Sequence, residues 1–367
     1  MKKGLIYFFA IFFALIITTL FLPYSCSRGY DKNGEFDKVM EDISNEKKVT
    51  QIAMLGAHDA FSGDINYLSR ANTNESGIVT NGFVGKIAKG LIVRFSKAQK
   101  GSAKDLLYGG VRYLDVRVTL INDEFYTCHG YVSNKLDYYL VDVIDFLETH
   151  PTEFVIFDIQ AYYTENGQNR NLPDSDYEKL RLHLEEYKNK NGKSLLDFVR
   201  YDSFNDKLND LTLGKVTNNK TNGGVIILAK NSSVSAFYSR DDDANSDPER
   251  EYTSIRSFWH ENNSTNQILN AIDGEYEFCK TQNYSGIFVV NQAQKTAFIM
   301  NTKIIRSLFG WSLTKMAVNF NKELTSDKDR FEKWLSEMPI FMVDYALSSK
   351  GDFNKLANEY IMEFNKK

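Results

Sequence analysis

Cysteine is scarce in this sequence. The chain has 367 residues but only three cysteines, Cys26, Cys128 and Cys279. They are too few and too scattered for a disulfide framework or a CxxC metal site. Charge of one sign is also lacking, since 44 basic residues stand against 48 acidic ones and give a net charge of −4. Because proteins bind nucleic acid by neutralising phosphates with basic side chains, we expect no nucleic-acid partner.

Three common catalytic motifs are missing as well. The sequence contains neither a GxxxxGK[ST] phosphate-binding loop nor a GxGxxG dinucleotide fingerprint. It also lacks the GxSxG nucleophile elbow, because the segment Asn283–Gly286 has no first glycine. We find no internal repeat at a fixed period. The chemistry of this chain must therefore be sought in other residues.

The amino-terminus has the pattern of a targeting segment. Lys2 and Lys3 precede an apolar run from Gly4 to Pro23, which is close to the ~20 residues that span a bilayer. We expect a signal or membrane anchor over residues 1–26, a linker over 27–35 and one catalytic domain over 36–367. Lipidation of Cys26, an uncleaved anchor and a cleaved signal remain alternatives. All three predict an extracytoplasmic protein, secreted or tethered to the membrane.

Short apolar runs separated by helical patterns or long polar connections dominate the rest of the chain. A hydrophobic content of 43% is ample for a packed core. Eight such runs in succession predict an α/β fold, a (β/α)8 TIM-type barrel in one catalytic domain. The strand candidates are Gln51–Leu55, Val111–Val118, Phe125–His129, Phe154–Ile159, Val225–Ala229, Ser254–Trp259, Ile287–Val290 and Ile340–Val343. Phe36–Ile43 is expected to form a short entry helix, and Leu140–Leu147 a helix ended by Pro151.

The connection over residues 60–102 is long for a loop of a barrel. From Phe83 to Phe95, apolar residues recur at helical spacing with basic residues between them. One interpretation is a helix packed on the barrel. The other is a lid or membrane-facing helix that rests on lipid head groups.

Charged residues gather at the ends of the first three strand candidates. Asp115 and Arg117 share one strand face, because side chains alternate between the two faces. His129 ends the next candidate, and His58 and Asp59 follow the first. Barrels of this class place their chemistry at the carboxyl ends of the strands, so we expect these side chains to form a site.

Two histidines at separate strand ends suit an acid and a base on opposite sides of a reacting centre. An arginine between them offers a fixed positive fork for a phosphate or carboxylate. A divalent cation such as Ca²⁺ is the rival interpretation, since His58, Asp59, Asp115, His129 and Asp158 are acceptable ligands. The permanent charge of Arg117 beside Asp115 favours a site without a metal cofactor.

Several segments resemble a known family. LGAHDAF, KGSAKDLLYGGVRYLDVRV, FYTCHG and VIDFLETHPTEFVIFDI are similar to the X domain of phosphatidylinositol-specific phospholipases C, particularly the metal-independent bacterial enzymes. The resemblance covers roughly Thr50 to Gln160. It implies a barrel phosphodiesterase that acts on a phospholipid at a membrane surface.

The resemblance implies roles for individual residues. His58 matches the general base that deprotonates the inositol 2-hydroxyl, and His129 the general acid that protonates the departing diacylglycerol oxygen. Arg117 matches the arginine that replaces calcium and binds a phosphate oxygen. Asp115 stands where the family has an acidic residue, and Asp59 follows the first histidine as a polar partner.

Three further residues are expected at the site. Asp344, after the last strand candidate, is our choice for the carboxylate that orients His58. Lys230, after the fifth, matches a basic residue that binds the inositol ring. Asp158 departs from the family, because bacterial members carry a lysine at the end of the fourth strand, and this change alters the expected inositol pocket.

We therefore expect a monomeric phosphoric diester hydrolase/lyase that cleaves a phospholipid, with phosphatidylinositol as the expected substrate, to give diacylglycerol and a cyclic inositol phosphate. Two alternatives remain open. One is a phosphodiesterase with another head-group specificity. The other is a non-catalytic barrel that binds lipid head groups or a protein partner.

Overall fold

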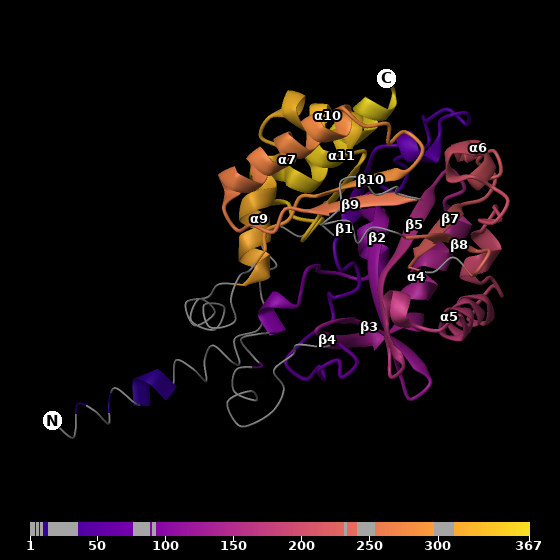
Figure 1. Cartoon of the computed structure of the whole chain (residues 1–367). Helices are drawn as coiled ribbons and strands as arrows, with labels where there is room; N and C mark the ends of the chain where they lie inside the picture. The colour runs from indigo at the N-terminus through magenta and orange to yellow at the C-terminus, as the bar shows by residue number, and fades with distance from the viewer. Residues whose placement is uncertain are drawn as a thin grey trace.

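The computed structural model describes residues 36–75, 93–230, 233–240, 254–296 and 312–367, together with residues 4, 7, 10–13 and 89 (Figure 1). Most of the expected anchor (1–26, with Cys26), the linker (27–35) and most of the amphipathic segment (83–95) lie outside these residues. None of the helices formed by the described residues combines the length and the apolar character that a bilayer-spanning helix needs. The division at residues 26 and 35 stays a prediction.

A curled sheet with eight parallel strands forms the centre of the molecule. Its spatial order is β8-β7-β5-β2-β1-β11-β10-β9, and each neighbouring pair is parallel. The expected (β/α)8 TIM-type barrel is confirmed, although no ladder joins β8 to β9 within the described ranges. The strands are β1 (Met54–Ala57), β2 (Val111–Ile121), β5 (Phe154–Thr164), β7 (Gly224–Ala229), β8 (Phe237–Ser239), β9 (Ile255–Trp259), β10 (Phe288–Gln292) and β11 (Ile340–Val343).

The barrel strands are buried on both faces, which explains why they read as continuous apolar runs. Tyr113, Ile156 and Ile340 belong to the interior cluster of the barrel. Their neighbours Leu114 and Val155 belong to a second cluster that includes the outer helices. Because the side chains alternate, every second residue of a strand faces the barrel interior, and this direction continues into the residues just beyond the strand ends.

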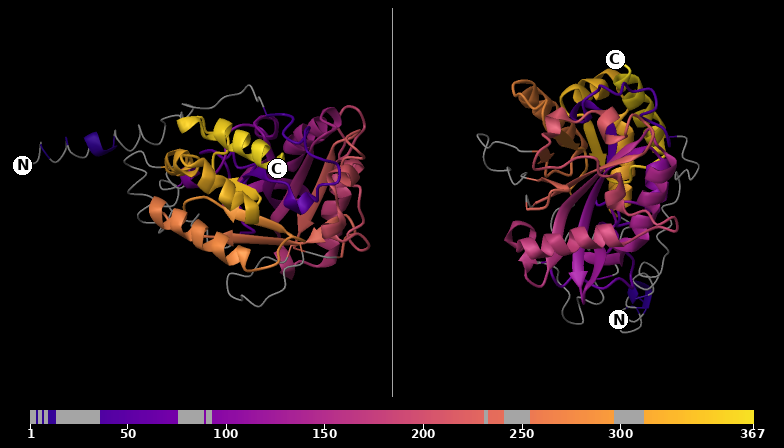
Figure 2. Two further views of the ribbon diagram at one scale, coloured as in Figure 1. Left: turned by 90° about the horizontal axis from the view of Figure 1, so that it is seen from above. Right: turned by 90° about the vertical axis from the view of Figure 1, so that its right-hand side faces the viewer.

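Helices cover the outside of the sheet (Figure 2). The expected helix around Leu140–Leu147 is confirmed as α4 and ends at His150, before Pro151. The helices are α3 (Ala103–Tyr108), α4 (Leu136–Thr149), α5 (Asp174–Glu186), α6 (Leu213–Val216), α7 (Thr265–Lys280), α9 (Leu313–Leu324), α10 (Lys328–Glu337) and α11 (Phe353–Asn365). The short 3-10 turns are η1 (Val49–Gln51), η2 (Val93–Phe95), η3 (Asn169–Asn171), η4 (Leu195–Phe198), η5 (Leu208–Asp210) and η6 (Lys350–Asp352).

The third strand candidate is not a barrel strand, so that assignment is wrong. It forms β3 (Glu124–His129), which runs antiparallel to β2 and also pairs with β4 (Tyr131–Lys135). A two-residue turn connects β2 to β3, and both of its residues, Asn122 and Asp123, have positive φ. This conformation is typical of a tight hairpin. A second short ribbon forms where β6 (Gly167–Gln168) pairs with β5.

The sequence pattern does not reveal β8, which is the fifth barrel strand in chain order. It has only three residues, Phe237–Ser239, and its pairing with β7 aligns Ile227 with Phe237. A segment this short carries too little periodicity to be told from a loop.

The expected entry helix over Phe36–Ile43 is also wrong, because this segment forms turns. Arg112 explains the difference. Its guanidinium is fully buried, pairs with Glu153 at 2.8 Å and donates to the carbonyl oxygen of Asp37 at 2.7 Å. The other oxygen of Glu153 accepts from the backbone N–H of Met40. These bonds use backbone groups that a helix would need, and they hold the segment under the interior cluster.

The Arg112–Glu153 pair gives the first prediction. Removing one partner of a buried ion pair leaves an uncompensated charge, so Arg112→Met is expected to lower the free energy of unfolding by about 3–5 kcal/mol. Arg181→Met is the matched control, since Arg181 pairs with half-exposed glutamates on α5 and should cost no more than about 1 kcal/mol. Urea unfolding measures both. Equal losses in the two variants would contradict the assigned role of Arg112.

Candidate active site

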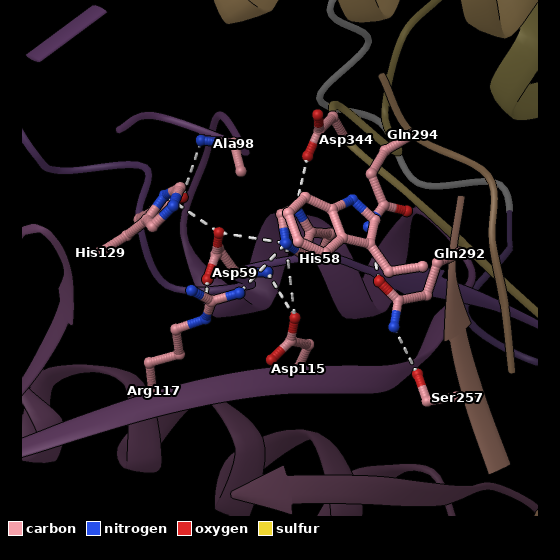
Figure 3. A network of polar contacts seen from close by, with 12 residues as sticks. His58, Asp59, Ala98, Asp115, Arg117, His129, Ser257, Gln292, Gln294 and Asp344 are labelled. Atoms are coloured by element: carbon pink, nitrogen blue, oxygen red, sulfur yellow. Dashed lines mark hydrogen bonds and ion pairs between the residues drawn. The ribbon is translucent and has the colours of Figure 1, made fainter. Parts of the chain in front are cut away.

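Six of the eight predicted site residues meet at the carboxyl edge of β11, β1 and β2 (Figure 3), namely His58, Asp59, Asp115, Arg117, His129 and Asp344. Strand register explains this meeting. Met342, Gly56 and Tyr113 lie side by side on three neighbouring strands. Two residues further along each strand, on the same interior face, stand Asp344, His58 and Asp115. A Cβ at Gly56 would lie 3.0 Å from the Tyr113 ring and 3.1 Å from Met342, so a larger residue there would push its neighbours apart directly below this row.

His58 lies at the centre of the site. Its Nδ1 is 2.7 Å from Oδ1 of Asp344, and its Nε2 is 3.2 Å from a guanidinium nitrogen of Arg117 and 3.3 Å from Oδ2 of Asp59. Burial acts to lower the pKa of this imidazole, but the carboxylates of Asp59, Asp344 and Asp115 outweigh burial and raise the pKa to about 9. The bond to Asp344 places one proton on Nδ1, so Nε2 is the nitrogen that gains or loses a proton.

Asp59 joins the two histidines and the arginine. One carboxylate oxygen pairs with Nε of Arg117, and the other is 3.0 Å from Nδ1 of His129. Burial acts to raise the pKa of this carboxyl, but Arg117 and then the two histidines outweigh burial and hold the pKa well below its ordinary value. Asp59 therefore stays ionised and compensates the charge of the guanidinium.

The backbone of Asp59 adopts a left-handed conformation, with φ at 44°. Few residues other than glycine take this conformation, although aspartate tolerates it better than most. The backbone N–H of Asp59 donates to Oδ2 of Asp115 at 3.2 Å, and the N–H of Ala60 donates to the carbonyl oxygen of Asp115 at 2.8 Å. Asp115 thus fixes the turn that carries His58 and Asp59.

His129 reaches the site through the β2–β3 hairpin. The register pairs Thr127 with Val118, so β3 runs back along β2 toward the barrel rim and ends at His129. Its ring centroid is 6.0 Å from that of His58, and its Nδ1 is 3.0 Å from the carbonyl oxygen of Ser96. The Asp59 carboxylate lies between the two rings, and the Arg117 guanidinium lies beside it (Figure 3). The arrangement places a fixed positive charge next to two proton-transfer groups.

Asp158 is placed differently from its expected role. It is fully buried in the barrel, where Nε of Arg240 donates to both carboxylate oxygens at 2.7 and 2.9 Å and the hydroxyl of Tyr113 bonds to one of them. Burial raises the pKa of Asp158 to about 6, although Arg240 acts in the opposite direction. This geometry favours a structural role inside the barrel over contact with a substrate. Lys230 directly follows β7 and is half-buried, two strands away from β2.

Sequence reasoning missed several residues that support the site. Arg240 was missed because it follows β8, the unrecognised strand. Asn321 on α9 donates to the carbonyl oxygen of Asp344 at 2.8 Å. Gln99 donates to the carbonyl oxygen of His58 at 2.9 Å. Amides that bond to backbone groups have no sequence signature of their own, so only the fold reveals them.

A cation site at this place was the rival interpretation. His58, Asp59 and Asp115 bring three ligand atoms within 4.8 Å of one another, in the part of the chain that the structure describes. Ca²⁺ prefers six to eight oxygen ligands. Here one ligand is an imidazole nitrogen 3.2 Å from the guanidinium of Arg117, which also pairs with Asp59. The donor set and the adjacent positive charge fit Ca²⁺ poorly.

Known proteins share this sequence pattern and fold. No family model matches the chain. "PI-PLC X domain-containing protein 3" of Mus musculus is 32% identical over 122 residues, which cover 31% of this chain and 38% of that protein. "Variant-surface-glycoprotein phospholipase C" of Trypanosoma brucei brucei is 35% identical over 132 residues, which cover 33% of this chain and 37% of that protein. The chain spans less than two fifths of the length of these curated relatives.

Solved structures extend the likeness to almost the whole chain. The phosphatidylinositol-specific phospholipase C of Staphylococcus aureus matches with a TM-score of 0.62 and 15% identity, over 92% of this chain and 99% of that one. The expected resemblance to the phosphatidylinositol-specific phospholipase C X-domain family is confirmed. The phosphatidylinositol-specific phospholipase C of Listeria monocytogenes matches with a TM-score of 0.52 and 16% identity, over 90% of this chain and 99% of that one. At these identities, the structural likeness establishes the fold.

The His58–Asp344 bond gives the second prediction. Asp344→Asn removes a charge that raises the pKa of His58, so that pKa should fall from about 9 toward its ordinary value near 6.5. Because the folded pKa lies above the unfolded one, this pair stabilises the fold fully below about pH 6.5 and loses its effect as the pH rises through about 9. Between about pH 6.5 and about pH 9, the free energy of unfolding should therefore decrease less in Asp344→Asn than in the wild-type protein.

Imidazole NMR titration and urea unfolding at several pH values measure these two effects. Asp137→Asn is the control, because Asp137 contacts His183 on the outside of the barrel and should leave the titration of His58 unchanged. An unaltered His58 pKa in Asp344→Asn would contradict the assignment of Asp344 as its partner.

Proposed function

We propose that this chain is a phosphoric diester hydrolase/lyase that cleaves a glycerophospholipid, with phosphatidylinositol as its expected substrate. One observation carries the proposal. Two imidazoles, His58 and His129, have ring centroids 6.0 Å apart at the carboxyl edge of the barrel, and the Asp59 carboxylate that contacts both rings also pairs with the Arg117 guanidinium. This arrangement supports acid–base cleavage of a phosphodiester without a nucleophile from the protein.

The reaction begins at the inositol 2-hydroxyl. Nε2 of His58 takes its proton, and the oxygen attacks the adjacent phosphorus. Asp344 holds Nδ1 of the same ring at 2.7 Å and stabilises the imidazolium that forms. Because the raised pKa keeps His58 protonated at neutral pH in the free protein, kcat/KM should increase as the pH rises toward 9.

Arg117 and His129 act on the other atoms of the phosphodiester. The guanidinium binds a non-bridging phosphate oxygen and stabilises the charge that builds up on it during attack. The bond between phosphorus and the diacylglycerol oxygen then breaks, and His129 donates a proton to that oxygen. The products are diacylglycerol and a cyclic inositol phosphate, and Asp59 compensates the charge of the arginine throughout.

The cellular setting belongs to the same proposal. The substrate lies in a membrane surface, and the apolar amino-terminal run supports an extracytoplasmic protein, either secreted or tethered. We expect a monomer, no nucleic-acid partner and no metal cofactor. Lys230, at the end of β7, remains our candidate for contact with the head group.

The third prediction tests the two histidines. A general acid or base is worth about 10²- to 10⁴-fold in rate, so His58→Ala and His129→Ala should each reduce turnover by at least this range. His183→Ala is the matched control, because His183 lies on α5 and contacts Asp137 away from the site. Phosphorus NMR of vesicles containing phosphatidylinositol identifies the cyclic product.

Two outcomes would contradict this proposal. Wild-type turnover in both histidine variants would remove their catalytic roles. Binding of inositol phosphate by the wild-type protein, with no cleavage in a panel of phosphodiesters, would favour the alternative of a non-catalytic barrel. Cleavage of another head group in that panel would correct the substrate.

The fourth prediction concerns the metal. Arg117 occupies the position from which a cation would stabilise the phosphate, and a divalent ion would repel it by about 4 kcal/mol per unit charge pair at 4 Å and an effective dielectric near 20. Turnover should therefore survive excess EDTA. Arg117→Ala should lose at least 10²-fold in kcat, comparable to removing one oxyanion donor, and added Ca²⁺ should not restore it.

Arg117→Lys is the matched variant in this test, because it keeps the charge but loses the fork that bonds to both Asp59 and a phosphate oxygen. It should recover only part of the rate. Loss of activity on chelation and its return with Ca²⁺ would instead identify His58, Asp59 and Asp115 as ligands.

A further inference from the structure

Gln99 is a buried amide that bonds to the backbone on both sides of the His58–Asp344 pair. Its side chain has no exposed surface. Its Nε2 donates to the carbonyl oxygen of His58 at 2.9 Å and to that of Val343 at 2.8 Å, and its Oε1 accepts from the N–H of Ala346 at 3.0 Å. Gln99 thus bonds to His58 itself, to Val343 directly before Asp344, and to Ala346 two residues after Asp344.

These three bonds fix the orientation of the amide. Only Nε2 can donate to two carbonyl oxygens, and only Oε1 can accept from an N–H, so a rotated amide would lose all three bonds. His58 directly follows β1, Val343 is the last residue of β11, and Ala346 lies three residues beyond that strand. The backbone ladder already joins these strand ends, since the N–H of His58 donates to the carbonyl oxygen of Val343 at 3.1 Å. Gln99 reinforces that link at the point where the ladder stops, beside the imidazole and its carboxylate.

The backbone around Gln99 makes further contacts with the site. We call residues 96–99 the strap. The carbonyl oxygen of Ser96 is 3.0 Å from Nδ1 of His129, and the carbonyl oxygen of Ala98 accepts from the N–H of Tyr345 at 2.7 Å. The hydroxyl of Ser62 accepts from the N–H groups of Ala98 and Gln99. The strap thus contacts the surroundings of both histidines.

The strap also supports two turns in an unusual conformation. Asp59 and Tyr345, the residues directly after His58 and Asp344, have φ of 44° and 50°. Such values are rare for residues with a side chain, and they persist where the surrounding structure enforces them. Tyr345 is held by Ala98, and Gln99 bonds to the residue on either side of the Asp344–Tyr345 turn.

We propose that Gln99 is a positioning residue, which reinforces the link between the ends of β1 and β11 and so holds the His58 imidazole against the Asp344 carboxylate. The inference rests on the proposed function for its effect on turnover, but its effect on the imidazole does not depend on any reaction. The competing explanation is that Gln99 only stabilises the fold, as a buried amide with good hydrogen bonds does.

Asn365 provides a matched control for that explanation. It is also a buried side-chain amide that bonds to the backbone at an end of β1, but at the opposite end. Its Oδ1 accepts from the N–H of Ala53 at 2.9 Å, and its Nδ2 donates to the carbonyl oxygen of Ala53 at 2.8 Å. Asn365→Leu should therefore lower the melting temperature without changing the site.

The experiment measures the pKa of His58 by imidazole NMR, together with kcat, KM and the melting temperature, in the full chain. Gln99→Met keeps the size of the side chain and removes its three bonds. We expect the His58 pKa to fall by at least one unit, because the contact with Asp344 loosens. We expect kcat to fall at least tenfold with KM little changed, because Arg117 still binds the phosphate.

Gln99→Asn, which keeps an amide but withdraws it by one methylene, replaces Gln99→Met if that variant does not fold, and the same fall in pKa is expected. An unchanged His58 pKa in the folded variant, or an equal fall in Asn365→Leu, would overturn the inference. If the chain cleaves no phosphodiester but the His58 pKa still falls in Gln99→Met, the proposed function is contradicted and this inference is supported.

Discussion

The bond between His58 and Asp344 joins the first and the last strand of the barrel. The two residues are 286 positions apart in the chain, so their contact exists only after β1 and β11 have paired in register. Closing a connection of this length costs conformational entropy that the sheet and its core must offset. The proton affinity of the central imidazole is therefore a property of the assembled barrel and of no local segment.

A second constraint is the compensation of charge inside the barrel. Arg117 pairs with Asp59 at the carboxyl edge of the strands, and Arg240 pairs with Asp158 in the barrel interior. Arg112 pairs with Glu153 at the amino ends of the strands. Buried charges persist when they are paired and hydrogen-bonded. The three pairs lie at different depths in the barrel. The Arg117–Asp59 pair is in contact with His58 and His129.

The sequence predicts the barrel and most of the site residues because both depend on strand ends. His58, Asp115 and Arg117 could be placed because alternation along a strand determines the face of each side chain, and Asp344 because it follows the last apolar run. β8 could not be predicted, since a strand of three residues shows no hydrophobic period. Arg240 was missed for the same reason, because it directly follows β8. The burial of Asp158 and the bonds of Gln99 depend on tertiary pairing, which no single segment encodes.

The two-residue turn at Asn122 and Asp123 has an evolutionary consequence. Because His129 arrives on a hairpin, its direction is set by counting residues along β3 from that turn, and side chains alternate with a period of two. Gaining one residue in β3 would direct His129 away from Asp59 and bring Cys128 to its position, and losing one residue would bring Gly130 there. Length variation in this ribbon is therefore restricted to even steps or to changes absorbed by a bulge, whereas the outer loops of the barrel are free of such a parity rule.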